Sequence, residues 1–174
     1  MPVLRLRQAL RLLSGGVPRL WRAAREAGAD RRTATDVVVT SVLALLVSAR
    51  VVGSGWREQN AVRHFAWQAH LAARHGEALA VAVGEAQERG SADPDDSRVD
   101  EANNRVGRAH GLAGGPALLR GGRWAALTRL AEAGRLEWQQ RELSAQPLAD
   151  GTDPRDAGRR AHPRAPRGPR RRGR

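Results

Sequence analysis

The stretch DVVVTSVLALLVSARVV, residues 36–52, is the most apolar part of the sequence and decides the fold class. Its residues 37–49 carry no charge, Arg50 follows them, and Gly53 is a typical helix stop. An uncharged run of this length is shorter than the about 20 residues that span a bilayer. The stretch therefore predicts a buried core helix, with Thr33 or Thr35 as the residue that caps its start.

The same stretch leaves the location of the protein open. Arg31 and Arg32 precede the apolar run, and Val47-Ser48-Ala49 resembles a signal peptidase site, so residues 1–49 are a candidate leader. Against a leader, the run begins far from Met1 and has Asp36 at its entry. We expect a cytoplasmic protein, with secretion or membrane association as alternatives.

Helical periodicity continues on both sides of this core helix. Two short basic amphipathic stretches precede it, and four further helical patterns follow it, while the chain as a whole lacks the period-two alternation of strands. The sequence predicts an all-α protein, a single compact helical bundle. Its parts are a basic amphipathic N-terminal segment (1–32), a helical domain (33–145) and a disordered tail rich in Arg, Pro and Gly (146–174). The helical patterns cover residues 3–14, 18–27, 57–74, 77–89, 97–110 and 124–144.

The net charge of +12 belongs to the two ends of the 174-residue chain. Residues 1–32 hold eight arginines against two acids and residues 155–174 hold nine against one, so the segment between them carries −2. All 30 basic residues are arginine, which a high-GC genome such as that of an actinobacterium explains. The absence of cysteine excludes disulfides and thiol chemistry. The ends are candidates for weak contact with a polyanion or an anionic membrane, without a specific nucleic-acid motif. The partners are otherwise unknown.

Polar residues gather at helical spacing in the central segment. Asn60, His64 and Trp67 share one helix face, and Asp100, Asn104 and Arg108 form a stripe on another helix. Asparagine is a poor residue for a helix interior, so such a stripe indicates that the amides bind something. Glycine at 107 within this helix indicates the close approach of another helix.

The central segment resembles an uncharacterised all-α domain of bacteria, found in actinobacteria and Firmicutes. The resemblance covers residues 60–111 and rests on Asn-Ala-x-Arg-His-x-x-Trp (60–67), Gly76, Ala80, Glu88 and Asp-x-x-Asn-Asn-x-x-Gly-Arg (100–108). It implies no established activity. The family usually has His-Glu before its last motif, where this chain has Gln87-Glu88, which weakens any site that needs a second imidazole there.

These residues make a hydrolase site the leading functional hypothesis. The candidate catalytic residues are His64, Glu88 and Asp100, a base and two carboxylates. The cofactor is unknown, and with a single imidazole a metal-free arrangement is favoured over zinc. The alternative is a non-catalytic interaction module, in which the polar residues are structural and the basic ends hold an acidic partner, nucleic acid or membrane. The candidate substrate-binding residues are Asn60, Asn103, Asn104 and Arg108, and His70 and His75 are expected at the surface.

Overall fold

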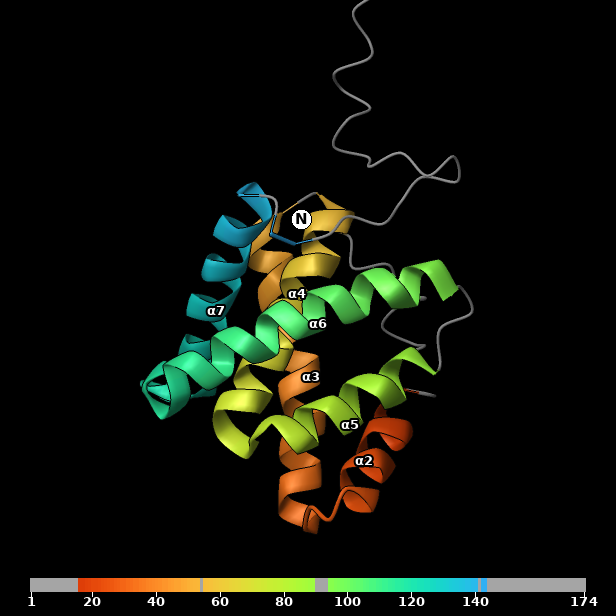
Figure 1. Cartoon of the computed structure of the whole chain (residues 1–174). Coiled ribbons are helices and arrows are strands. Elements are labelled where there is room, and N and C mark those ends of the chain that lie inside the picture. Colours follow the sequence, from red (N-terminus) through yellow and green to blue (C-terminus); the bar gives the residue numbers. More distant parts are fainter. Residues whose placement is uncertain (1–15, 54, 90–93, 141, 144–174) are drawn as a thin grey trace, which may run out of the picture.

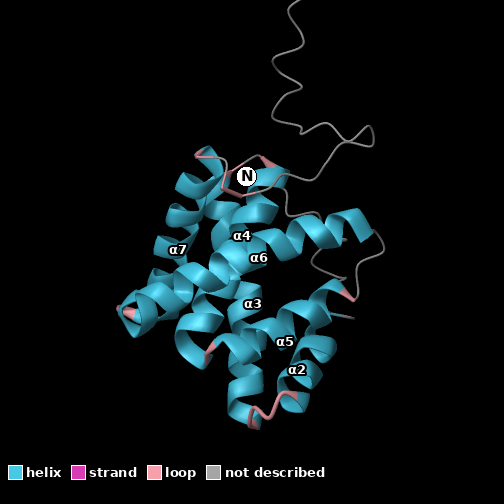
Figure 2. Cartoon of the chain, in the orientation of Figure 1, coloured by secondary structure: helices cyan, strands magenta, loops and turns pink. Residues whose placement is uncertain are grey.

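The described part of the chain consists of helices, which confirms the all-α prediction (Figure 2). The structure is a computed structural model that describes residues 16–53, 55–89, 94–140 and 142–143. The predicted helix at 3–14 and the tail at 146–174 lie outside these residues. The helices are α2 (Val17–Glu26), α3 (Arg31–Val52), α4 (Trp56–His75), α5 (Glu77–Glu88), α6 (Pro94–Gly114), the short 3-10 helix η2 (Gly115–Leu119) and α7 (Gly122–Gln139).

Helix α3 begins earlier than the sequence predicted, because Asp30 caps it. The Asp30 carboxylate accepts a hydrogen bond from the backbone N–H of Thr33 at 2.7 Å, from an extended backbone. The prediction that Thr33 or Thr35 caps the helix is therefore wrong, and the Thr35 hydroxyl instead bonds the Arg31 carbonyl inside the helix. The earlier start lengthens the helix to 22 residues.

One face of α3 packs into the core and the other remains accessible. Val37, Ala44 and Val47 are buried, whereas Val39 and Leu46 are exposed. By length and composition α3 could cross a membrane, and 33% of that apolar window is buried in the protein. The core helix of a globular protein and a signal sequence near the N-terminus both meet the same criteria of length and composition.

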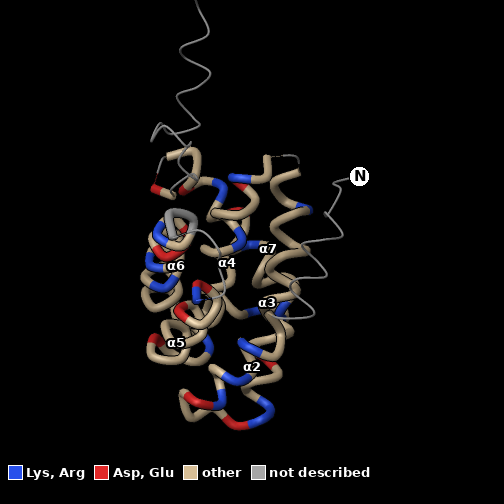
Figure 3. The backbone as a smooth tube through the Cα atoms, turned by 90° about the vertical axis from the view of Figure 1, so that its right-hand side faces the viewer, with Lys and Arg blue, Asp and Glu red and all other residues tan. Residues whose placement is uncertain are grey.

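Helix α4 is the centre of the bundle. Figures 1 and 3 place it between a layer formed by α5 and α6 and a layer formed by α3 and α7, and it contacts all four helices. Nearly every side chain from 61 to 72 is buried, including Phe65 and Leu71. Helix α2 packs Leu20, Ala23 and Ala24 against α3 and α5.

Helix α6 crosses α4 through glycines, as Gly107 in the sequence indicated. A Cβ atom added to Gly107 would lie 2.9 Å from the Phe65 Cα, and one added to Gly111 would lie 2.9 Å from the Ala69 Cα. A side chain at either position would push the two backbones apart. The missing Cβ atoms allow the polar side chains of the two helices to meet.

Candidate functional site

Three pairs of polar side chains join α4 to α6 in one register. The Asn60 amide donates to the Asp100 carboxylate at 2.7 Å, and His64 Nδ1 lies 2.9 Å from Asn104 Oδ1. In the third pair, residue 108 of α6 donates from its guanidinium to the Gln68 amide oxygen at 3.3 Å. Because both partners advance by four residues from pair to pair, one polar stripe of each helix faces the other.

The three predicted catalytic residues meet at one end of these stripes. A ring nitrogen of His64 and a carboxylate oxygen from each of Glu88 and Asp100 lie within 4.8 Å of one another. They come from α4, α5 and α6. The His64 side chain is 1% exposed and the Asp100 side chain is 16% exposed, so the group lies largely inside the protein. We call His64, Glu88 and Asp100, together with Asn60, Arg63 and Asn104, the His64 cluster.

The two nitrogens of His64 have different partners. The Asn104 oxygen only accepts a hydrogen bond, so Nδ1 carries a proton. Nε2 lies 2.5 Å from an Arg63 guanidinium nitrogen and 3.2 Å from an Asp100 oxygen. A lone pair on Nε2 accepts from Arg63, and a proton on Nε2 donates to Asp100. Nε2 therefore has a partner in either protonation state, which is what an atom that exchanges protons requires.

The electrostatics of the His64 cluster differ from one carboxylate to the other. Burial raises the pKa of Glu88 to about 7, and its Oε1 atom is buried without a hydrogen-bond partner. Burial acts in the same direction on Asp100, but the His64 ring, Arg63 and the Asn60 amide outweigh it and hold the pKa of Asp100 below its usual range. The site thus combines Asp100, whose charge is balanced by neighbouring donors, with Glu88, which has one buried oxygen without a hydrogen-bond donor.

Three of the four predicted substrate-binding residues are buried, and Asn60, Asn104 and Arg108 make hydrogen bonds to other side chains. Asn104 is fully buried, Asn103 is 1% exposed and Arg108 is 6% exposed. The Arg108 guanidinium also donates to Glu101 at 2.6 Å, and Asn60 accepts from Arg63 at 2.7 Å. Asn60 thus bonds Asp100, and Asn104 bonds His64. Arg108 pairs with Glu101, which lies two turns before it on α6.

Sequence reasoning missed three members of this network. Arg63 stands within the motif at 60–67, beside His64, yet was not assigned a role. Gln68 continues the spacing of Asn60 and His64 by one more turn, which was the available signal. Glu101 lies seven residues before its arginine partner, two turns along the same helix face.

A second polar cluster lies toward the other end of α4. Asp36 of α3 accepts from Arg74 at 3.1 Å and pairs with His75 at 3.0 Å and with Arg123 of α7. Burial opposes ionisation of Asp36, but these partners outweigh it and hold its pKa below the usual range. We call Asp36, Arg74, His75 and Arg123 the Asp36 cluster.

The prediction that His70 and His75 lie at the surface is wrong for His70. His70 is 1% exposed and its Nδ1 atom has no hydrogen-bond partner. Burial lowers its pKa to about 4 despite the nearby charge of Asp36. His75 is 14% exposed because it turns toward Asp36. The spacing along α4 could not show this, since the burying helices come from distant segments.

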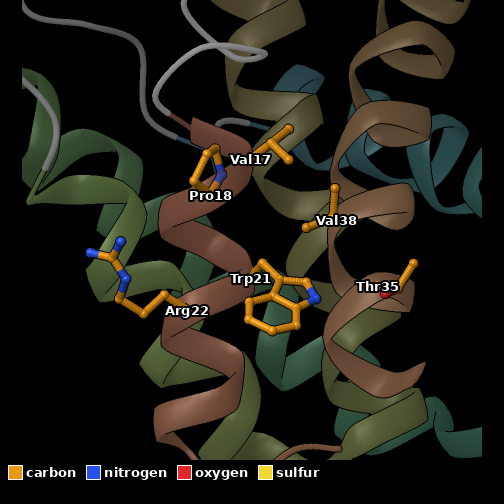
Figure 4. A pocket seen from close by; sticks show the side chains of 6 residues that line it. All are labelled: Val17, Pro18, Trp21, Arg22, Thr35 and Val38. Atoms are coloured by element: carbon orange, nitrogen blue, oxygen red, sulfur yellow. The ribbon is translucent and has the colours of Figure 1, made fainter. Parts of the chain in front are cut away.

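An apolar groove lies apart from both clusters, between α2 and α3 (Figure 4). It encloses about 430 Å³. Trp21 lies between the two helices in the close-up view, and its side chain is 36% exposed. The lining residues are Val17, Pro18, Trp21, Arg22, Thr35 and Val38.

Comparisons with known proteins add no relative to this description. No protein-family model, no curated protein and no solved structure matches the chain.

Proposed function

We propose that the chain is a small hydrolase that uses the His64 cluster to activate water against an ester or phosphodiester bond. The observation that carries this proposal is the convergence of His64, Glu88 and Asp100 from three helices, with atoms that lie within 4.8 Å of one another. Water is the nucleophile because the cluster contains no serine, threonine or cysteine.

In this reaction Nε2 of His64 accepts a proton from water. The new N–H donates to Asp100, while Nδ1 stays bonded to Asn104, so the ring keeps its orientation throughout. The water oxygen bonds to the electrophilic carbon or phosphorus, and the bond to the leaving oxygen breaks. The leaving oxygen then receives the proton from Nε2, and the nearby charge of Arg63 stabilises negative charge that develops in the transition state.

Hydrolysis of chromogenic esters and phosphodiesters by the full-length chain tests the proposal. We expect His64→Gln and Asp100→Asn each to lower kcat/KM by about 100-fold or more, a range common for the loss of an acid–base group or of the carboxylate that holds its proton. Glu85→Gln is the control, because it removes a carboxylate from the neighbouring helix α5 whose side chain is 61% exposed. Equal rates in the Asp100→Asn and Glu85→Gln variants, with both proteins folded, would refute the proposal.

The second candidate is the interaction module, and the burial of Asn103, Asn104 and Arg108 favours it. A buried polar network between helices fixes how they pack without any catalysis. In that case the substitutions at His64 and Asp100 change only the stability. Removal of residues 155–174 would then weaken binding to a polyanion in low salt.

A further inference from the structure

The Arg63 guanidinium holds a positive charge where several acceptors of the His64 cluster meet. One terminal nitrogen of Arg63 lies 2.7 Å from Asn60 Oδ1 and 2.5 Å from His64 Nε2. The same guanidinium interacts electrostatically with Asp100 and Glu88. Two acceptor atoms of α4 thus contact this cation, and one carboxylate from each of α5 and α6 lies within range of its charge.

This arrangement is incomplete with Arg63 alone. The guanidinium brings one positive charge to two carboxylates, and the buried Glu88 Oε1 remains without a partner. A buried carboxylate oxygen without a donor indicates a ligand that supplies positive charge.

We propose that the His64 cluster binds one divalent cation, held by His64 Nε2, Asp100, Glu88 and Asn60 Oδ1, which displaces the Arg63 guanidinium. Two ligands that lie about 2.1 Å from one ion are roughly 3.0 to 3.4 Å apart. The separation of His64 Nε2 and the Asp100 oxygen, 3.2 Å, already falls in that range. The carboxylate of Glu88, a half-buried side chain, has an oxygen within 4.8 Å of both of these atoms.

The second ring nitrogen of His64 is arranged as in known metal sites. A ligating histidine commonly donates its other N–H to a carbonyl or carboxylate, which fixes the ring. Nδ1 of His64 makes this bond to the Asn104 oxygen, from a side chain that is fully buried. Nε2 is therefore the nitrogen that faces the cation, and metal binding there replaces a proton.

The donor set selects among cations. A single imidazole with two carboxylates and an amide oxygen is oxygen-rich, which suits Mn²⁺ better than Zn²⁺. The sequence favoured a metal-free site because it lacked a second imidazole, and the structure offers the Asn60 oxygen as the fourth donor. The inference rests on the proposed hydrolase and changes one step of it. With Nε2 bound to the cation, Nε2 no longer accepts a proton, and a cation-bound water, which loses its proton to solvent at its lowered pKa, supplies the nucleophile.

Calorimetric titration of Mn²⁺ into the metal-stripped full-length chain tests the inference. We expect one Mn²⁺ per chain and at least tenfold weaker binding by Glu88→Gln and by Asp100→Asn. Glu85→Gln, with its exposed carboxylate on the same helix, should bind as the wild type does. Arg63→Met should bind about tenfold more tightly, because the competing positive charge is gone. A purely structural Arg63 would not produce that gain.

Several outcomes overturn the inference. They are no Mn²⁺ binding up to millimolar concentration, or Mn²⁺ binding that Glu88→Gln leaves unchanged while circular dichroism shows a folded protein. Hydrolysis on the same samples separates the two proposals. Activity that persists in EDTA without Mn²⁺ binding removes the cation and keeps the hydrolase. Mn²⁺ binding with the expected variant pattern but no hydrolysis removes the hydrolase and keeps the cation.

Discussion

The two polar clusters on α4 use the same residue types in opposite proportions. The Asp36 cluster surrounds one carboxylate with two arginines and a histidine, and each of these groups lies close enough to pair with it. The His64 cluster sets two carboxylates against one arginine, and one carboxylate oxygen is left buried without a partner. A satisfied carboxylate stabilises the fold, whereas an unsatisfied one carries a cost that a fold alone does not explain.

The difference separates a structural tie from a candidate site. Asp36 joins α3 to α4 and α7, three helices that must stay together for the core to exist. The Oε1 atom of Glu88 accepts no hydrogen bond from another helix. Functional sites tend to retain such locally unfavourable groups, because binding or catalysis requires them.

The largest expected effect is a pH response of the stability that has opposite signs for His70, beside the Asp36 cluster, and for Glu88 in the His64 cluster. The folded-state pKa of His70, beside the Asp36 cluster, is about 4, below its unfolded value of 6.5. The unfolded chain therefore binds an extra proton between pH 6.5 and 4, and stability falls as the pH falls, by up to about 3 kcal/mol. The pKa of Glu88 is about 7, above its unfolded value of 4.5, so the folded chain holds the extra proton and stability rises as the pH falls from 7 to 4.5.

In the wild type these two contributions oppose each other, and Glu88→Gln should expose the loss from His70. Urea unfolding in EDTA at pH 7 and pH 4.5 measures it, since EDTA keeps Glu88 free of cations. We expect the variant to lose about 2 to 3 kcal/mol on acidification and the wild type clearly less. If wild type and variant respond equally, the two clusters do not differ in the way the pKa values indicate.

Asp36→Asn tests the structural side of the contrast. The amide keeps the shape of the carboxylate but leaves two arginines without a counter-charge, and we expect a loss of about 2 kcal/mol in the free energy of unfolding. The expected loss is moderate because Arg74 is 45% exposed and Arg123 is 30% exposed. Glu58→Gln is the matched control, since Glu58 pairs with a single arginine on α7 at 3.4 Å. A loss as large in the control would show that the number of partners is not what matters.

The sequence predicted the helices better than their polar contacts. Periodicity revealed the helices and the two stripes, and Gly107 correctly indicated where α6 approaches α4. These features depend on residues within one or two helical turns. The start of α3 was missed because Asp30 and Thr33 compete as caps, and only the backbone conformation decides between them.

The charges around each cluster could not be predicted in the same way. Asp36 meets Arg123 across 87 positions of the chain, and no spacing rule connects them. Arg63 lies beside His64 in the sequence, and neighbours in a helix normally point in different directions. The long side chain of Arg63 nevertheless contacts the ring of His64. The hydrogen bond to Asn60 and the charge of Asp100 hold the guanidinium there, and both depend on the fold.

The smallest expected effect is the sharpest test, because it has the opposite sign to that of Asp36→Asn. At pH 7.5 in EDTA, Glu88→Gln should stabilise the chain by about 1 kcal/mol, since the amide removes a buried charge that has an unpaired oxygen. Glu85→Gln should leave the stability unchanged, because that carboxylate is exposed. Thermal unfolding of the wild type and of these two variants measures the order of their stabilities. A destabilised Glu88→Gln variant would mean that Glu88 supports the fold as Asp36 does, and the two clusters would then both be structural ties. A gain in stability together with a loss of Mn²⁺ binding would instead show that the chain keeps Glu88 at a cost to its fold, for the ligand that it binds.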